Sequence, residues 1–149
     1  MADTLDYDLV SPERRVASGK ALEVRLPGME GEMAAMPGHV PLVTTLRPGI
    51  VRVRVEDGST EEYCVVGGAA QITAEGVTIL AEDSLHISEI TQDAVDRFFE
   101  AARLKQEEAQ KQAEETEDYG IVDDAARIMA DMSSLAIDMG YETRGPAPS

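Results

Sequence analysis

The sequence predicts a mainly β fold with an added α part: an N-terminal antiparallel β-sandwich followed by a C-terminal antiparallel two-helix hairpin. Up to about residue 88, apolar and polar residues alternate with the period of a strand, and most of the glycines and prolines lie there. Beyond that point the apolar residues follow helical spacing. The chain has 149 residues, of which 43% are hydrophobic and 28% charged, which suits a folded domain with an appendage. We therefore expect a sandwich domain at 1–88, a helical hairpin at 89–140 and a disordered tail at 141–149.

Short strands joined by turns, with no helical segment between them, indicate a sandwich or barrel. Gly58 ends a predicted hairpin turn at residues 56–58, because glycine adopts positive φ without steric cost. Gly67 and Gly68 interrupt one strand, and residues 74–76 form a second turn. The expected strands cover residues 22–26, with Leu22, Val24 and Leu26 on one face, and residues 51–55, 62–66, 70–73 and 77–80.

Residues 27–42 differ from the strands around them. This segment combines glycines and prolines with three methionines, and we expect it to form one long shaped loop rather than a strand. Loops of this length in small domains are usually functional. Within the loop, His39 has two open interpretations: its ring binds the loop backbone, or it contacts a partner.

The second half of the chain predicts two helices. Thr91 suits the N-cap of the first, with Asp93 in its first turn, and Tyr119–Gly120 is expected to stop it. Gly140 is expected to cap the second helix. Apolar residues of the second helix repeat at steps of four and three, as in a heptad seam: Ile121, Ala125, Ile128, Met132, Leu135 and Met139.

The charge balance restricts the possible partners. The 13 basic and 29 acidic residues give a net charge of −16. Nucleic acid and anionic lipid are both bound through basic patches, so we expect neither as a ligand and favour a protein partner or a cation. Three acidic residues among the first eight argue against a signal peptide, and no run of 18 apolar residues predicts a membrane span. We expect a soluble chain that stays in the compartment where it is made.

Signals for catalysis and metal binding are weak. Cys64 is the single cysteine, and with two histidines it cannot complete a Cys/His zinc site. Its place in an alternating strand favours a buried, inert thiol over a reactive one. The sequence has no phosphate-binding glycine motif and no metalloprotease motif, and the many carboxylates are best interpreted as a solvated surface. We therefore assign no catalytic, metal or cofactor-binding residues.

A set of motifs in the first half is similar to a known family. The motifs lie between residues 10 and 81, in the family's order and spacing: Val10-Ser11-Pro12-Glu13, Ser18-Gly19, Pro27-Gly28 with Glu30-Gly31-Glu32, Pro37-Gly38-His39-Val40-Pro41-Leu42, Pro48-Gly49, Gly67-Gly68 and Val77-Thr78-Ile79-Leu80-Ala81. Together they resemble the epsilon subunit of bacterial F-type ATP synthase, equivalent to the mitochondrial delta subunit. That family folds as a β-sandwich followed by a helical hairpin.

The resemblance implies a non-catalytic central-stalk subunit that takes part in ATP synthesis and proton transport. In the family, the sandwich links the gamma subunit to the ring of c subunits, and the hairpin contacts the alpha and beta subunits transiently. The complex would place this chain peripherally on the cytoplasmic side of the plasma membrane. By the same resemblance, Glu30, Gly31, Glu32 and His39 are expected to face the c-ring.

The resemblance is incomplete in the helices. Family members that bind ATP carry an Asp and an Arg where this sequence has Thr91 and Ala94, so no nucleotide cofactor is expected. Family members that inhibit hydrolysis use basic residues on the second helix. Residues 118–140 instead hold five aspartates (118, 123, 124, 131 and 138) and one arginine, a net charge of −4, so weak or absent inhibition is expected. Two alternatives remain: a free-standing sandwich interaction module with a coiled-coil tail, and, below it, a hydrolase that uses the acidic surface.

Overall fold

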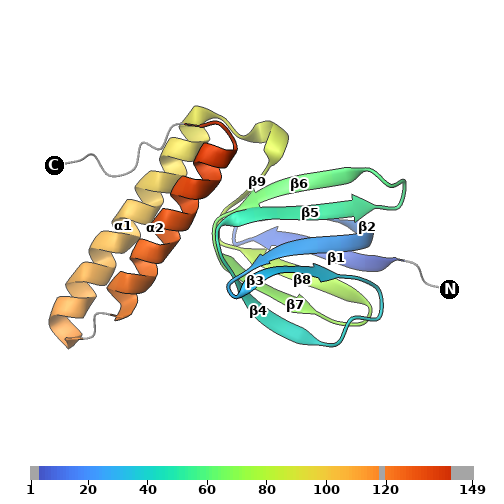
Figure 1. Ribbon diagram of the computed structural model, residues 1–149, viewed down its shortest axis with the longest axis horizontal. Helices are drawn as coiled ribbons and strands as arrows, with labels where there is room; N and C mark the ends of the chain where they lie inside the picture. The colour runs from blue at the N-terminus through green and yellow to red at the C-terminus, as the bar shows by residue number, and fades with distance from the viewer. Residues whose placement is uncertain (1–3, 118–119, 142–149) are drawn as a thin grey trace. The chain divides into compact units, whose positions relative to one another are not determined.

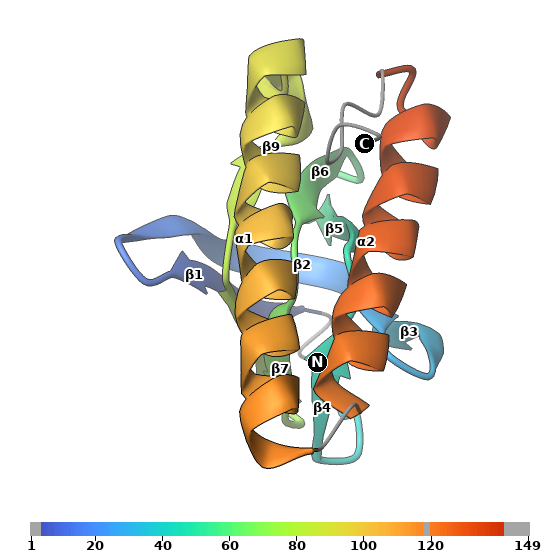
Figure 2. The same ribbon diagram turned by 90° about the vertical axis from the view of Figure 1, so that its left-hand side faces the viewer.

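A computed structural model describes residues 4–117 and 120–141 of the chain. Within them the chain divides into two compact units, Met1–Glu89 and Ile90–Ser149. The first unit contains the β strands and the second the two long helices, as Figures 1 and 2 show. No helix among the described residues is long and apolar enough to cross a membrane.

The first unit is a sandwich of nine strands, which confirms the predicted fold class. In chain order the strands are β1 (Leu5–Ser11), β2 (Arg14–Gly28), β3 (Gly31–Ala35), β4 (Leu42–Leu46), β5 (Gly49–Val55), β6 (Thr60–Val65), β7 (Gly68–Ile72), β8 (Gly76–Ala81) and β9 (Ser84–His86). A short 3-10 helix, η1 (Ile87–Glu89), follows β9.

The long strand β2 belongs to both layers of the sandwich. Its first half pairs with β1, whose other neighbour is β8, followed by β7 and β4. Its second half pairs with β3 on one side and with β5 on the other, and β6 and β9 follow β5 in that order. The inward residues of both layers form one core, in which Leu5, Leu9, Leu26, Leu46, Ile72, Ile79, Val24, Val51, Val53 and Val65 are fully buried. Such close-packed interiors resist deformation.

Three sequence predictions in this unit need correction. The sandwich is not wholly antiparallel, because β1 and β8 run parallel. Residues 27–42 are not one loop, because β3 occupies Gly31–Ala35 and only residues 36–41 are irregular. Leu22 is only half-buried, because a β-bulge between Ala21 and Glu23 shifts the alternation and turns Ala21 into the core instead.

The predicted inert thiol has a clear structural basis. Cys64 lies in β6 and is 2% exposed. Burial raises the pKa of its thiol to about 11, since the thiolate would lose its hydration. The reactive thiolate is therefore scarce at neutral pH.

The second unit is a pair of helices, α1 (Gln92–Thr116) and α2 (Gly120–Asp138). The predicted caps form: the Thr91 hydroxyl accepts the Ala94 N–H at 3.1 Å, and Gly140 lies at φ +86°. Beyond Gly140, the Tyr141 N–H donates to the Ala136 carbonyl and completes a Schellman motif. The Tyr141 hydroxyl also donates to the Ile90 carbonyl at 2.8 Å, so the end of α2 is tied to the residue before the Thr91 N-cap of α1.

The break between the helices differs from the prediction. The first helix ends at Thr116, where Glu117 adopts a left-handed conformation (φ 60°), and Gly120 begins α2 instead of stopping α1. On the predicted seam Met132 is buried, and Ala136, which the seam omitted, is buried as well. Some positions of the prediction lie outside the described residues: residues 118 and 119, the predicted tail beyond Tyr141, and the side chains of Ile121 and Asp124.

Candidate functional site: two surfaces of the sandwich

The residues predicted to face a partner fall into two groups in the structure. Glu30, Gly31 and Glu32 lie together at the hairpin between β2 and β3. His39 lies in the loop before β4, where the neighbouring Gly38 N–H donates to the Ala74 carbonyl at 2.9 Å. Strand β4 connects the surroundings of the hairpin with those of the His39 loop. The last residue of β4 pairs with the hairpin end of β2, and its first residue pairs with Ile72, close to the His39 loop. The sequence grouped these residues because strand β3 was not recognised between them.

The β2–β3 hairpin is tight and firmly anchored. Gly28 pairs with Gly31, so that only Met29 and Glu30 form the turn. A Cβ atom on Gly28 would lie 2.7 Å from the Gly31 carbonyl oxygen, which explains the need for glycine there. The Met29 N–H donates to the Thr45 carbonyl at 2.8 Å and ties the turn to β4. Glu30 is exposed at the tip and makes no described polar contact.

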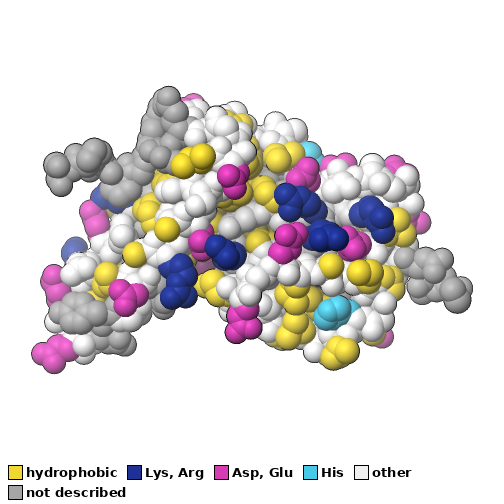
Figure 3. All heavy atoms as spheres, viewed as in Figure 1, with side chains coloured by type: hydrophobic (Ala, Val, Ile, Leu, Met, Phe, Trp, Pro, Cys, Tyr) yellow, Lys and Arg dark blue, Asp and Glu magenta, His cyan; other side chains and the backbone are white. Residues whose placement is uncertain are grey.

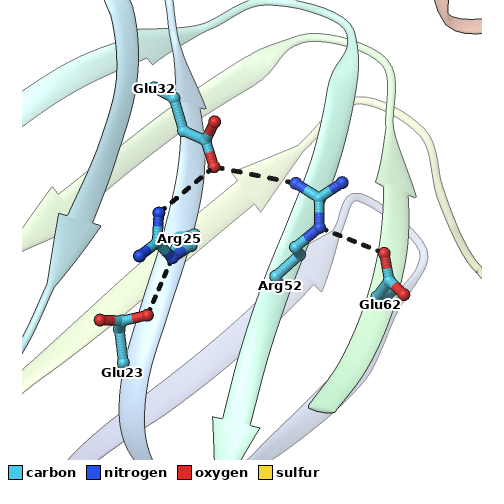
Figure 4. A network of polar contacts seen from close by, with 5 residues as sticks. All are labelled: Glu23, Arg25, Glu32, Arg52 and Glu62. Atoms are coloured by element: carbon cyan, nitrogen blue, oxygen red, sulfur yellow. Dashed lines mark hydrogen bonds and ion pairs between the residues drawn. The ribbon is translucent and has the colours of Figure 1, made fainter.

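Glu32 belongs to a network of ion pairs, which Figure 4 shows along the outer surface of β2, β3, β5 and β6. Its carboxylate lies 3.9 Å from Arg25 and 3.8 Å from Arg52. Arg25 also pairs with Glu23 at 2.9 Å, and Arg52 pairs with Glu62 at 3.2 Å. Exposed pairs contribute little stability each, so the network mainly fixes side-chain positions. We name this the charged face, defined by Glu23, Arg25, Glu32, Arg52 and Glu62.

The His39 loop is held by its own backbone. His39 N–H donates to the Met36 carbonyl at 3.1 Å, and its ring nitrogen Nδ1 lies 2.6 Å from the Val40 carbonyl oxygen. That short contact requires Nδ1 to carry the proton. The structure shows the ring bound to the loop backbone, and the expected contact of His39 with the c-ring stays a prediction.

The opposite layer presents a surface of different chemistry. The outward positions of β4, β7 and β8 carry no charge at all, although 28% of the chain is charged. These outward residues form adjacent cross-strand pairs and define what we call the uncharged face: Val43, Thr45, Ala69, Gln71, Thr78 and Leu80. Val43 is 69% exposed and Leu80 56%.

The uncharged face continues into the His39 loop, where Met36 is 50% exposed and Val40 74%. In Figure 3 hydrophobic side chains gather along the sandwich edge where Figure 1 has β4 and β7, whereas both signs of charge gather over β2 and β5. Depletion of charge with exposed aliphatic groups is typical of the centre of a protein interface. Sequence reasoning missed this face, although the alternation within residues 42–46, 68–72 and 76–81 carried the signal.

Among the described residues, no group of three or more His, Cys, Asp or Glu side chains could hold a metal ion. A β-sandwich with one charged and one uncharged face, joined to a helical hairpin, has the features of a subunit that works by binding other proteins.

Comparison with known proteins gives the family. Residues 4–87 match the family model described as "ATP synthase, Delta/Epsilon chain, beta-sandwich domain". The ATP synthase epsilon chain of Ruegeria sp. (strain TM1040) is 50% identical over 93% of this chain and 98% of its own length. The corresponding chain of Paracoccus denitrificans is 43% identical over 95% of each chain. The chain belongs to the delta/epsilon family of ATP synthase subunits, which confirms the resemblance.

A solved structure shares the fold over most of the chain. The similarity is to a chain in the cryo-EM structure of the Euglena gracilis mitochondrial ATP synthase containing OSCP, F1 and the c-ring. The TM-score is 0.66 at 20% identity, covering 93% of this chain and 83% of the other. The fold therefore persists where most of the sequence has changed.

Proposed function

We propose that this chain is a non-catalytic central-stalk subunit of a proton-translocating F-type ATP synthase. In this role it joins the gamma subunit to the c-ring and couples ring rotation to ATP synthesis. The observation that carries the proposal is the family membership across both units, combined with a rigid sandwich that has two chemically distinct faces. The complex holds the chain peripherally on the cytoplasmic side of the plasma membrane.

The two faces suit two different partners. The uncharged face fits a permanent contact with gamma, because apolar surface drives stable association without a desolvation penalty for charge. The hairpin carrying Glu30, Gly31 and Glu32 fits the polar loops of the c-ring, where a carboxylate can meet a basic side chain. His39 was expected in the ring contact too, and its position at the other end of β4 makes it a separate test.

Crosslinking in the assembled synthase tests the ring contact. Cys64 is buried and is the single native cysteine, so an introduced thiol reports its own position. We expect Glu32→Cys to crosslink to a c-subunit loop. Thr60→Cys is the matched control. Thr60 pairs with Arg54 near the end of β5, and this end of the strand lies away from Pro27 and therefore away from the hairpin. The same experiment with His39→Cys decides whether that loop also reaches the ring. Crosslinks from position 32 to head subunits alone would contradict the proposed placement.

We further propose that the hairpin inhibits ATP hydrolysis weakly or not at all through contacts with the alpha and beta subunits. In the described part of α2, Asp123, Asp131 and Asp138 outnumber Arg127, so an acidic partner surface would repel the helix. Deleting residues 89–149 is expected to raise hydrolysis less than about twofold, a barrier change below roughly 0.5 kcal/mol. The test compares the ATPase rates of synthase assembled with full-length and truncated chains. A tenfold activation would show that the acidic helix is inhibitory.

A further inference from the structure

The end of the sandwich unit contains a side-chain cluster that the docking function leaves unexplained. His86, the last residue of β9, bonds through both ring nitrogens. Nε2 lies 2.6 Å from a carboxylate oxygen of Glu61 on β6, and Nδ1 lies 2.7 Å from the Ser88 hydroxyl. The Ser88 backbone N–H also donates to Nδ1, at 3.1 Å. The ring packs edge-on against Tyr63, with centroids 5.1 Å apart and an interplanar angle of 89°.

These contacts define the protonation state of the ring. Because a backbone N–H can only donate, Nδ1 must be the unprotonated nitrogen, and the proton of the neutral ring lies on Nε2, facing Glu61. His86 therefore binds β6 with one nitrogen and, with the other, the segment Ile87–Glu89. That segment immediately precedes the second unit, which starts at Ile90.

We propose that Glu61, His86 and Ser88 form a protonation-sensitive clamp on the segment that joins the sandwich to the helical hairpin. When His86 takes up a second proton, Nδ1 becomes a donor and can no longer accept the Ser88 N–H. The Ser88 hydroxyl can reverse its role and accept from Nδ1, whereas the backbone N–H loses its partner. Protonation therefore keeps His86 on Glu61 and releases the backbone of the joining segment.

The groups around the ring favour this outcome. Glu61 and Tyr63 face it from β6, and Ser88 faces it from η1, which also carries Glu89. Tyr7 of β1 lies near Glu61 and Tyr63. Burial raises the pKa of both tyrosines, so they stay neutral at physiological pH. Imidazole is the one side chain of this set that ordinarily titrates near neutral pH. The Glu61–His86 pair thus becomes a charge-assisted bond when the ring is protonated.

The test is a pH titration of the isotopically labelled full-length chain by NMR, between about pH 5 and 8.5. At high pH, the His86 nitrogen shifts should report an unprotonated Nδ1 and a protonated Nε2. On acidification, the Ser88 amide signal should move with the same midpoint as the His86 ring. Its protection from hydrogen exchange, corrected for the intrinsic pH dependence, should fall about two- to tenfold, the contribution of one hydrogen bond.

Two variants separate the clamp from other titrating groups. His86→Gln should abolish the pH response of the Ser88 amide, while His39→Gln, which removes the other histidine of the chain, should leave it intact. Ser88→Ala keeps the backbone N–H, so the amide at position 88 should still follow the ring. A Ser88 amide that stays fixed while the His86 ring titrates would overturn the proposal. So would a response that persists in a folded His86→Gln chain, since another group would then control the segment.

Discussion

Replacing Gly68 with alanine is expected to unfold much of the sandwich. Gly68 is the first residue of β7 and lies at φ +127°, a conformation that residues with a Cβ atom rarely adopt. An added Cβ would lie 2.0 Å from the Leu80 carbonyl oxygen and 2.9 Å from the Ala81 Cα. Both are backbone atoms of β8, so relief requires separating two paired strands. We expect a loss of at least about 4 kcal/mol, comparable to the whole stability of a marginal domain.

A matched variant isolates the steric part of this effect. Gly58, in the turn between β5 and β6, also has positive φ (+89°), but a Cβ atom there would meet nothing within 4 Å. Gly58→Ala should therefore cost only the backbone strain, about 1–2 kcal/mol. Urea unfolding followed through the amide signals of the β strands gives both free energies without interference from the helices. Similar losses for the two variants would contradict the close approach of β7 to β8.

The sequence predicted the parts of this fold that depend on local pattern. The turn at Gly58 was predictable because its positive φ requires a glycine. The Thr91 and Gly140 caps were predictable because their hydrogen bonds join residues only a few positions apart. The strands over residues 51–55 and 77–80 follow from alternation, since Val51, Val53, Val77 and Ile79 are buried. These features require no knowledge of the remainder of the chain.

What the sequence did not predict depends on pairing partners far away in the chain. Leu5, Tyr7 and Leu9 alternate with acids as a strand should, yet nothing local indicates that β1 pairs in parallel with β8. Strand β3 was missed because glycine, glutamate and alanine, which make up most of it, rank low as strand formers, whereas pairing with β2 decides the outcome. The end of α1 and the start of α2 were misplaced because Glu117, not a glycine, takes the left-handed position.

The candidate surfaces were predictable to different degrees. The resemblance grouped Glu30, Gly31 and Glu32, and the structure places them on one hairpin. The ion pairs of Glu32 with Arg25 and Arg52 join three strands and leave no sequence signature. The uncharged face needs the register of β4, β7 and β8, because only the register shows that Val43, Gln71 and Thr78 are neighbours. His86 and Glu61 are 25 residues apart and meet only through the pairing of β6 with β9.

The second large effect is expected on the uncharged face, at its most exposed aliphatic strand residue, Val43. Val43→Asp places a carboxylate on a side chain that is 69% exposed, so the free chain should fold as before. If this face binds gamma as proposed, the carboxylate would be buried among uncharged neighbours and lose its hydration without gaining a partner. We expect the affinity for gamma to fall at least about a hundredfold, which corresponds to roughly 2.7 kcal/mol.

Two controls distinguish lost docking from added charge or altered shape. Val43→Thr changes one methyl group to a hydroxyl and should weaken binding by less than about tenfold, because a hydroxyl costs far less to desolvate than a carboxylate. Thr60→Asp adds the same charge at the exposed start of β6, in the other layer of the sandwich, and should leave the affinity unchanged. Calorimetric titration of purified gamma with each chain measures all three. An affinity of Val43→Asp within threefold of the unaltered chain would show that gamma binds elsewhere, because burying an unpaired carboxylate in an interface causes a large loss of affinity.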